Sequence, residues 1–167
     1  MSTQITAEPP ATPAPPRLPK ELLANAAFLL ARLGFTFKTR AIEEVEAAGF
    51  SLYDYSVMAV LAEKPRETQA TVADALRVDR SQLVGILDAL EERGLVVRKR
   101  DPNDRRRHVV SLTPEGKKHL GRLRTIIGRL VDDLLAPLDV DERRTLHRLV
   151  LKLSRHHDPR CGPGNGD

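Results

Sequence analysis

The sequence predicts a mainly α-helical protein with one small β-hairpin. Apolar residues recur at helical spacing through most of residues 20–157, and capping residues, glycines and prolines divide that stretch into separate helices. Residues 95–113 break this pattern, because two short runs rich in Val flank a charged stretch, as in a hairpin. Aromatic residues make up only 4% of the chain and Trp is absent, which suits helices packed through Leu, Val and Ala.

The 167 residues are enough for one domain, and both ends of the chain differ in composition from the rest. Residues 1–19 hold six of the twelve prolines and few large apolar side chains, so they bury too little surface to offset the entropy of ordering. We expect a disordered Pro-rich tail there, a flexible Gly/Pro-rich tail over residues 158–167, and the folded domain over residues 20–157.

Two helices are predicted before the central motif. Residues 20–49 have a broad apolar face, which predicts one long helix with more apolar surface than a single neighbour covers. Residues 52–63 are nearly all apolar, which predicts a buried helix that ends before Lys64-Pro65.

The central motif is a pair of short helices joined by a tight turn. The first helix is predicted over residues 68–76. The second begins after a two-residue turn, where Asp79 and Gln82 have the spacing of a capping box. Gly94 ends it, since glycine tolerates the positive φ of a helix terminus.

The two faces of the second helix differ in chemistry. One stripe is predicted to be buried, because its apolar residues recur at i, i+3, i+4 and i+7: Leu83, Ile86, Leu87 and Leu90. The opposite face is predicted to carry Arg80, Ser81, Gln82, Val84, Gly85 and Asp88. In a helix-turn-helix this face enters the DNA major groove.

The hairpin that follows is strongly basic. Six cations stand against two Asp between its strands: Arg98, Lys99, Arg100, Arg105, Arg106 and Arg107. Residues 93–124 hold eleven Arg or Lys against three Asp or Glu, a local charge of +8, whereas the whole chain carries only +4. Positive charge concentrated beside a helix-turn-helix favours binding to phosphates.

These features together predict a winged helix-turn-helix over residues 52–112 that binds DNA. Each feature alone has a simpler explanation, since amphipathic helix pairs are common and charge runs are usually solvated surface. Some winged helices are protein–protein adaptors instead. An adaptor has no need of a basic wing, and its association would depend only weakly on salt.

The stretch DRSQLVGILDALEERGLVVRKRDPNDRRRHVVSLTPEG resembles the recognition helix, wing and following helix start of the MarR family of bacterial transcriptional regulators. Its Asp-Pro-x-Asp-x-Arg wing and Leu-Thr-x-x-Gly motif occur at that family's separation, and the similarity covers roughly residues 20–157. The resemblance implies that Arg106 enters the minor groove and that Asp104 orients the wing. The chain departs from the family at Val84 and Gly85, where a Thr-Arg pair is frequent, so those base contacts are not carried over.

The individual DNA contacts are assigned from the chemistry of the side chains. Gln82 suits adenine, Ser81 a base or a phosphate, and Val84 a thymine methyl group. Arg80 is assigned to phosphate or guanine, and Arg106 to a narrow A·T minor groove. The phosphate contacts are assigned to Arg98, Lys99, Arg100, Arg105 and Arg107. Thr68, Gly85 and Asp104 complete the predicted DNA-binding set.

Two further helices are predicted after the wing. Thr113-Pro114-Glu115 is a helix start, and the apolar stripe that follows is typical of paired helices. Asp139 with Glu142 caps a last helix, whose apolar residues are Leu146, Leu149, Val150 and Leu153.

These stripes either pack together within one chain or pair two chains. A winged helix needs only three helices for its own core, so we favour dimerisation helices over residues 20–49 and 113–157. The resemblance implies the same arrangement, a symmetric homodimer with intertwined terminal helices. Such a dimer reads an inverted repeat with half-sites about one DNA turn apart.

The resemblance also implies how the protein is controlled. Such regulators, most often repressors, release DNA when a small, often aromatic and anionic molecule binds between the dimer helices and the DNA-binding lobe. The candidate lining residues are Arg32, Phe35, Tyr53 and Tyr55. The two tyrosines are also explained as core residues with hydroxyls at the rim.

Oxidant sensing and metal binding are alternatives at the C-terminus. Cys161 lies among cationic and His side chains that favour a thiolate: Arg155, His156, His157 and Arg160. Oxidant-sensing members of the family place their Cys near the N-terminus, where this chain has none. His156, His157 and Asp158 are ligand types without a scaffold to fix them, so no metal and no cofactor are expected.

Other protein classes lack their signatures. No apolar run reaches the ~20 residues of a membrane span, and no signal segment starts the chain. A single Cys excludes an internal disulfide framework. The Gly-rich residues 162–166 follow no strand and open no helix, so they are no dinucleotide fingerprint, and no enzyme is predicted. We expect a cytoplasmic, nucleoid-associated protein.

Overall fold

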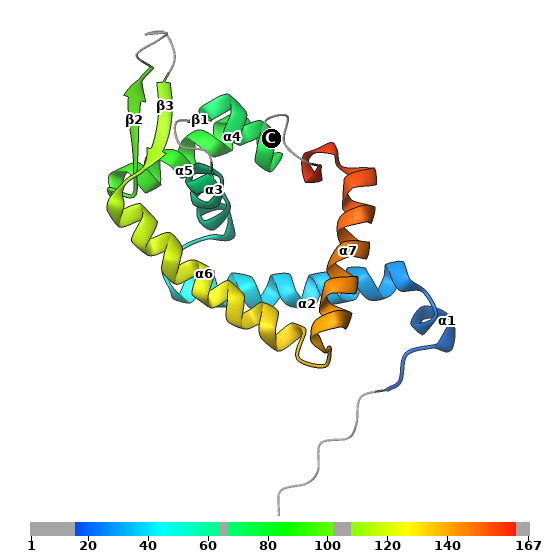
Figure 1. Cartoon of the computed structure of the whole chain (residues 1–167). Coiled ribbons are helices and arrows are strands. Elements are labelled where there is room, and N and C mark those ends of the chain that lie inside the picture. The colour runs from blue at the N-terminus through cyan, green and yellow to red at the C-terminus, as the bar shows by residue number, and fades with distance from the viewer. Residues whose placement is uncertain (1–15, 64–66, 102–107, 163–167) are drawn as a thin grey trace, which may run out of the picture. The chain divides into compact units, whose positions relative to one another are not determined.

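The computed structural model describes residues 16–63, 67–101 and 108–162, and its contacts divide the chain into two compact units, residues 1–36 and 37–167 (Figure 1). Most of the predicted N-terminal tail, the tip of the hairpin and the last five residues of the predicted C-terminal tail therefore lie outside the described residues.

The N-terminal unit contains a short helix and the start of a long one. α1 covers Lys20–Leu23, and α2 covers Ala26–Ala47 and continues into the second unit. The prediction of a single helix over residues 20–49 is therefore wrong at its start. The interruption falls at Asn25, whose Oδ1 accepts a hydrogen bond from the amide of Phe28 at 3.1 Å and so caps α2.

The second unit carries the predicted helix-turn-helix and hairpin. Its elements are α3 (Leu52–Glu63), β1 (Glu67–Thr68), α4 (Gln69–Leu76), α5 (Arg80–Glu92), β2 (Val96–Arg100), β3 (His108–Leu112), α6 (Pro114–Leu134), α7 (Val140–His157) and the 3-10 helix η1 (Pro159–Cys161). The mainly helical fold class with a small wing is confirmed.

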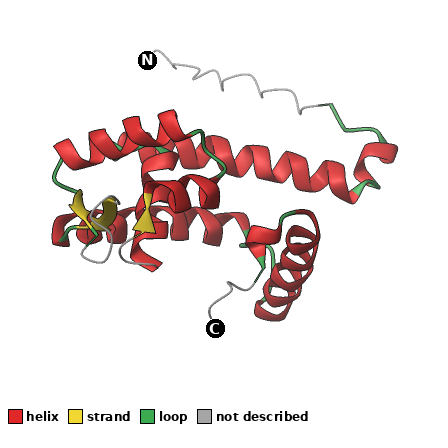
Figure 2. Ribbon diagram, turned by 90° about the horizontal axis from the view of Figure 1, so that it is seen from above, coloured by secondary structure: helices red, strands yellow, loops and turns green. Residues whose placement is uncertain are grey.

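The strands form one antiparallel sheet in the order β1-β3-β2 (Figure 2, strands in yellow). β2 and β3 are the predicted hairpin, with Val96 opposite Leu112. β1 pairs with β3 by placing Glu67 opposite Val110. It escaped prediction because a strand of two residues is too short to show alternation.

One apolar core holds α3, α4, α5, α6 and the sheet together. Its most fully buried large side chains are Met58, Leu83, Leu87, Leu90, Leu120, Leu123, Val45, Val57, Val72 and Val110. The predicted stripe of α5 is confirmed, since Leu83, Leu87 and Leu90 are at most 1% exposed and Ile86 packs against them. Among the described residues no polar side chain is buried in this core.

The start of α6 is set by a close approach of two backbone segments. Thr113 Oγ1 accepts a hydrogen bond from the Gly116 amide at 3.0 Å and donates to the Gly94 carbonyl at 2.7 Å. A Cβ atom on Gly116 would lie 2.0 Å from the carbonyl oxygen of Leu95. Glycine is therefore required here by space, which gives the Leu-Thr-x-x-Gly motif a physical basis.

α7 differs from α6 because it leaves its apolar residues exposed. α7 begins with the predicted capping box, since Asp139 Oδ1 accepts from the Glu142 amide at 2.9 Å and Glu142 Oε2 accepts from the Asp139 amide at 2.9 Å. None of its residues is buried, and Leu149 and Leu153 are 46% and 52% exposed. No helix within the described residues has the length and apolar character to cross a bilayer.

The close approach at Gly116 leads to a stability prediction. Gly116→Ala should lower the free energy of unfolding by about 1–3 kcal/mol, because the added methyl group forces α6 away from the Leu95 carbonyl. Gly121→Ala is the matched control on the same helix, where nothing lies within 4 Å, and it should stabilise by about 0.5–1 kcal/mol. Urea unfolding of both variants measures the difference, and equal effects would contradict the steric explanation.

Candidate nucleic-acid interface

The helix-turn-helix is fixed by its caps and its turn. Thr68 Oγ1 accepts from the Thr71 amide at 3.2 Å and so starts α4. Arg77 ends that helix at φ 54°, and it is the only described residue other than glycine with positive φ. The amide of Val78 then bonds the Ala73 carbonyl at 3.2 Å, which closes the turn.

Asp79 caps the recognition helix α5. Its Oδ1 accepts from the Ser81 amide at 2.7 Å and also from the Ser81 hydroxyl. These bonds, the hydroxyl first and the amide second, hold the pKa of Asp79 below its usual range. The predicted return bond from Gln82 is not formed among the described residues, so α5 has the cap without the full box. The Ser81 hydroxyl proton is engaged by the cap, which leaves its oxygen to accept.

The outer face of α5 is open, as predicted. Arg80, Ser81, Gln82 and Gly85 are exposed, and the Val84 side chain is 40% exposed beside them. A small hollow of about 190 Å³ between α4 and α5 adjoins this face; its lining residues are Gln69, Ala70, Arg80, Leu83 and Val84. The face is therefore polar with one apolar patch.

The hairpin projects from the helices of the second unit (Figure 1). Lys99 and Arg100 are exposed at the far end of β2. The wing-tip residues Asp104, Arg105, Arg106 and Arg107 lie outside the described residues, so their assigned contacts stay predictions.

Arg98 differs from its neighbours on the hairpin. Its side chain is 20% exposed, and its guanidinium pairs with two carboxylates of α5, Asp88 and Glu91, at 2.6 Å and 3.3 Å. Sequence reasoning grouped it with the phosphate-binding cations because all six stand in one basic run. Only the fold shows that this one is turned toward α5.

Part of the local positive charge is compensated inside the fold. Arg98 is paired with the carboxylates of Asp88 and Glu91 on α5. When the count starts at Asp88 and so includes the acidic end of α5, the local charge falls from +8 to +5. The remaining excess still exceeds that of the whole chain.

The four candidate effector residues fall in both units. Arg32 and Phe35 lie on the part of α2 before residue 37, and both are exposed. Tyr53 is exposed on α3, whereas Tyr55 packs against the core. These four residues were chosen from the sequence by their chemistry, and their spacing in the sequence does not define a shared cavity.

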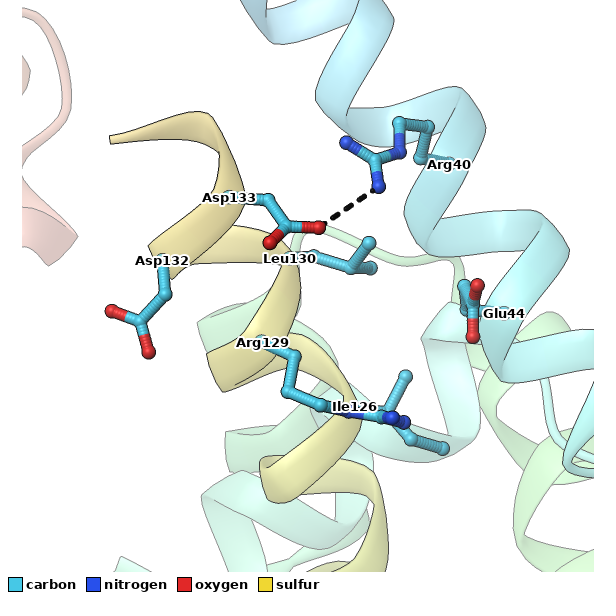
Figure 3. Close-up of a pocket in the computed structure, with 7 residues that line it drawn as sticks. All are labelled: Arg40, Glu44, Ile126, Arg129, Leu130, Asp132 and Asp133. Carbon is cyan, nitrogen blue, oxygen red and sulfur yellow. Dashed lines mark hydrogen bonds and ion pairs between the residues drawn. The ribbon is translucent and has the colours of Figure 1, made fainter. Parts of the chain in front are cut away.

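A charged cavity of about 250 Å³ lies between α2 and α6, at a place that sequence reasoning missed (Figure 3). Arg40 reaches from α2 toward Asp133 on α6, with Nη2 and Oδ2 at 3.2 Å. The other lining residues are Glu44, Ile126, Arg129, Leu130 and Asp132, and none of the four candidates is among them. The two helices are distant in sequence, so no local pattern marked this site.

The C-terminal segment is bonded to the helix-turn-helix rather than loose at its start. Asp158 accepts from Arg160 Nε at 2.7 Å and lies 3.9 Å from Arg77 Nη1. Hydrogen bonds from Arg160, followed by the charges of Arg160 and Arg77, lower the pKa of Asp158. Arg160 Nη1 also donates to the Asp74 carbonyl at 3.3 Å. Part of the predicted C-terminal tail, residues 158–162, is therefore ordered by these contacts, and its last five residues lie outside the described residues.

The structure offers little support for an oxidant-sensing site at Cys161 or for a metal site near the C-terminus. Cys161 is a free, exposed thiol, and its carbonyl accepts from Arg155 Nε at 3.1 Å. Within residues 16–63, 67–101 and 108–162, no three His, Cys, Asp or Glu side chains gather as a metal site.

Comparison with known proteins assigns the chain to a family. Residues 48–107 match the MarR family. The transcriptional regulator HosA of Escherichia coli O111:H- is 35% identical over 99 residues, which are 59% of this chain and 73% of HosA. The chain belongs to the MarR family. The MarR family consists of transcriptional regulators rather than enzymes, which agrees with the prediction from the sequence.

Two further relatives agree with this assignment. A protein of Thauera aromatica described as a regulatory protein for the hcr operon is 40% identical over 101 residues; the match spans 60% of this chain but only 61% of the relative. The repressor CouR of Rhodococcus jostii RHA1, solved on a 23-mer DNA duplex, has 31% identity and a TM-score of 0.73, with 84% of this chain and all of that chain covered. A second CouR structure contains p-coumaroyl-CoA.

The cap of the recognition helix predicts a pH-dependent stability difference. The folded-state pKa of Asp79 lies below its ordinary value of 3.8, so its contribution is present above that value and is lost as the pH falls through the folded pKa. Asp79→Ala should therefore lower the urea midpoint at neutral pH, and the gap to the natural protein should close below pH 3.8. Asp79→Asn keeps a capping oxygen without charge and should fall between the two. A gap that widens in acid would refute the assignment.

Proposed function

We propose that this MarR-family protein is a homodimeric, ligand-responsive repressor that binds an inverted-repeat operator. The observation that carries the proposal is a capped recognition helix with an open polar face, held beside an exposed basic hairpin on one core. Acting as a transcriptional regulator, the protein works on DNA in the bacterial cytoplasm, in association with the nucleoid.

The homodimer is supported by apolar surface that this chain leaves uncovered. Leu149 and Leu153 are about half exposed on α7, and Leu23, Leu30 and Leu33 are more than 40% exposed in the N-terminal unit. In proteins most of the stability of a helix comes from packing of its apolar face rather than from intrinsic propensity. A second copy of the chain provides that packing.

The dimer sets the form of the operator. Two α5 helices related by a twofold axis enter successive major grooves about 34–36 Å apart, so the half-sites lie about one turn apart. We assign base contacts to Gln82 and Val84, phosphate contacts to Lys99 and Arg100, and a phosphate or guanine contact to Arg80. Arg106 is assigned to the minor groove, by the family resemblance of the wing.

The effector is proposed as a small aromatic anion or its thioester. Support comes from CouR, whose structure with p-coumaroyl-CoA shows that one relative takes such a compound. In this chain the candidate effector residues Arg32, Phe35, Tyr53 and Tyr55 supply a cation and aromatic rings. The effector must bind more tightly to the dimer whose recognition helices are misaligned, or it shifts no equilibrium.

Selection of bound sequences from a random duplex pool tests the DNA-binding proposal. The recovered sequences should share a palindrome with half-site centres about 10 bp apart, because two recognition helices and two wings bind together. Their affinity should fall steeply with salt, by about 0.9 in logarithmic slope for each phosphate contact. A pool that yields no shared sequence, or only an unpaired half-site, would overturn the proposal.

Charge placed on the uncovered face of α7 tests the homodimer. Leu149→Glu/Leu153→Glu should convert the dimer to monomers and weaken binding to the palindrome, because four carboxylates would be buried in the interface. Arg144→Glu is the control, since Arg144 lies on the opposite side of α7 and is 77% exposed. Sedimentation equilibrium gives the masses. A double variant that stays dimeric would place the interface elsewhere.

A further inference from the structure

We propose that Arg98 is a positioning residue for DNA binding: it fixes the wing to the recognition helix and neutralises that helix's acidic edge, and it makes no phosphate contact. The inference rests on the proposed DNA-binding function and assigns Arg98 a role different from that of the other hairpin cations.

The contacts of Arg98 run along one edge of α5. Nη1 lies 2.6 Å from Asp88 Oδ1 and 3.3 Å from Glu91 Oε2, and Nη2 donates to the Val84 carbonyl at 3.5 Å. These three partners stand at i, i+4 and i+7, so one guanidinium spans two turns of the helix. The backbone amide of Arg98 also donates to Glu91 Oε1 at 3.0 Å. Main chain and side chain of one residue thus tie β2 to α5.

The guanidinium is committed to these partners. The Arg98 side chain is 20% exposed, and its Nε is buried without a hydrogen-bond partner in the part of the chain that the structure describes. Turning the side chain toward a phosphate would leave the carboxylates of Asp88 and Glu91 uncompensated. Lys99, the next residue, points to the other face of the strand and is exposed.

The position of Arg98 explains why the geometry matters for DNA. Arg98 pairs in register with Val110, whose buried side chain belongs to the core. Arg98 therefore fixes the part of the hairpin that packs against α5. The exposed cations Lys99 and Arg100 lie farther along β2. Asp88 is on the outer face of α5, and Arg98 holds its carboxylate in an ion pair along the edge of the helix.

The salt dependence of DNA affinity separates positioning from phosphate contact. Removing a phosphate contact lowers the logarithmic salt slope by about 0.9. Removing a positioning residue lowers the affinity at every salt concentration and leaves the number of released counterions unchanged. Arg98→Ala should therefore weaken binding to the selected duplex by about tenfold with an unchanged slope. Lys99→Ala, the matched neighbour, should reduce the slope by about 0.9.

A double-mutant cycle tests whether Arg98 acts through the α5 carboxylates. Arg98→Ala is compared in the natural background and in an Asp88→Asn/Glu91→Gln background, so that the general effect of removing two negative charges cancels. The loss should shrink from about tenfold to less than about twofold in the neutral background. A phosphate contact would lose the same factor in both backgrounds.

A conservative variant covers the case in which Arg98→Ala does not fold. Arg98→Lys keeps the positive charge but cannot span Val84, Asp88 and Glu91 with one planar group. It should lose affinity with an unchanged salt slope, whereas a phosphate contact would be largely preserved by Lys. Circular dichroism checks the fold of each variant.

The outcomes separate this inference from the proposed function. A natural protein that binds no duplex, or binds with no salt slope, overturns the proposed function and this inference with it. A natural protein that binds the palindrome while Arg98→Ala lowers the slope by about 0.9, with equal losses in both backgrounds, overturns this inference alone.

Discussion

The burial of one stripe of α5 is the constraint on which the rest of the structure depends. Leu83, Leu87 and Leu90 are almost completely inaccessible in a core shared with α3, α4, α6 and the sheet. Such burial is worth about 1.5–3 kcal/mol for each leucine relative to an exposed position. It fixes the rotation of the helix about its axis, so Gln82, Val84 and Gly85 must face outward. The predicted recognition surface and the buried stripe are therefore opposite faces of the same helix.

Much of this was predictable because it is local. The stripe of α5, the Asp79 and Asp139 caps and the hairpin follow from patterns between residues near one another in the sequence, and the structure has all of them. Asn25 was not recognised as a cap, since asparagine also occurs within helices. The α2–α6 cavity depends on Arg40 and Asp133, which are 93 residues apart. The ion pairs of Arg98 with Asp88 and Glu91 were not predicted, because the contacts of a strand side chain depend on the helix packed beside it.

Folding and assembly are linked through α7. This helix has a full capping box and an apolar stripe, yet none of its residues is buried within its own chain. Polar contacts link the segment after α7 to the helix-turn-helix, with Arg160 donating to the Asp74 carbonyl and Asp158 near Arg77. Exposed ion pairs of this kind contribute little stability. In the proposed dimer, a second copy of the chain would cover the apolar residues that α7 leaves exposed.

The same polar contacts give α7 a mechanical connection to the DNA-binding motif. Arg77 is the residue whose left-handed backbone makes the turn between α4 and α5, and Asp74 is in the last turn of α4. A displacement of α7 must either carry the turn with it or break the bonds from Arg160 and Arg77. The carboxylate of Asp158 is stabilised in its charged form by hydrogen bonds and by both guanidinium groups, so acidification across the neutral range does not release it. A displacement of α7, rather than acidification across the neutral range, is therefore what would break this connection.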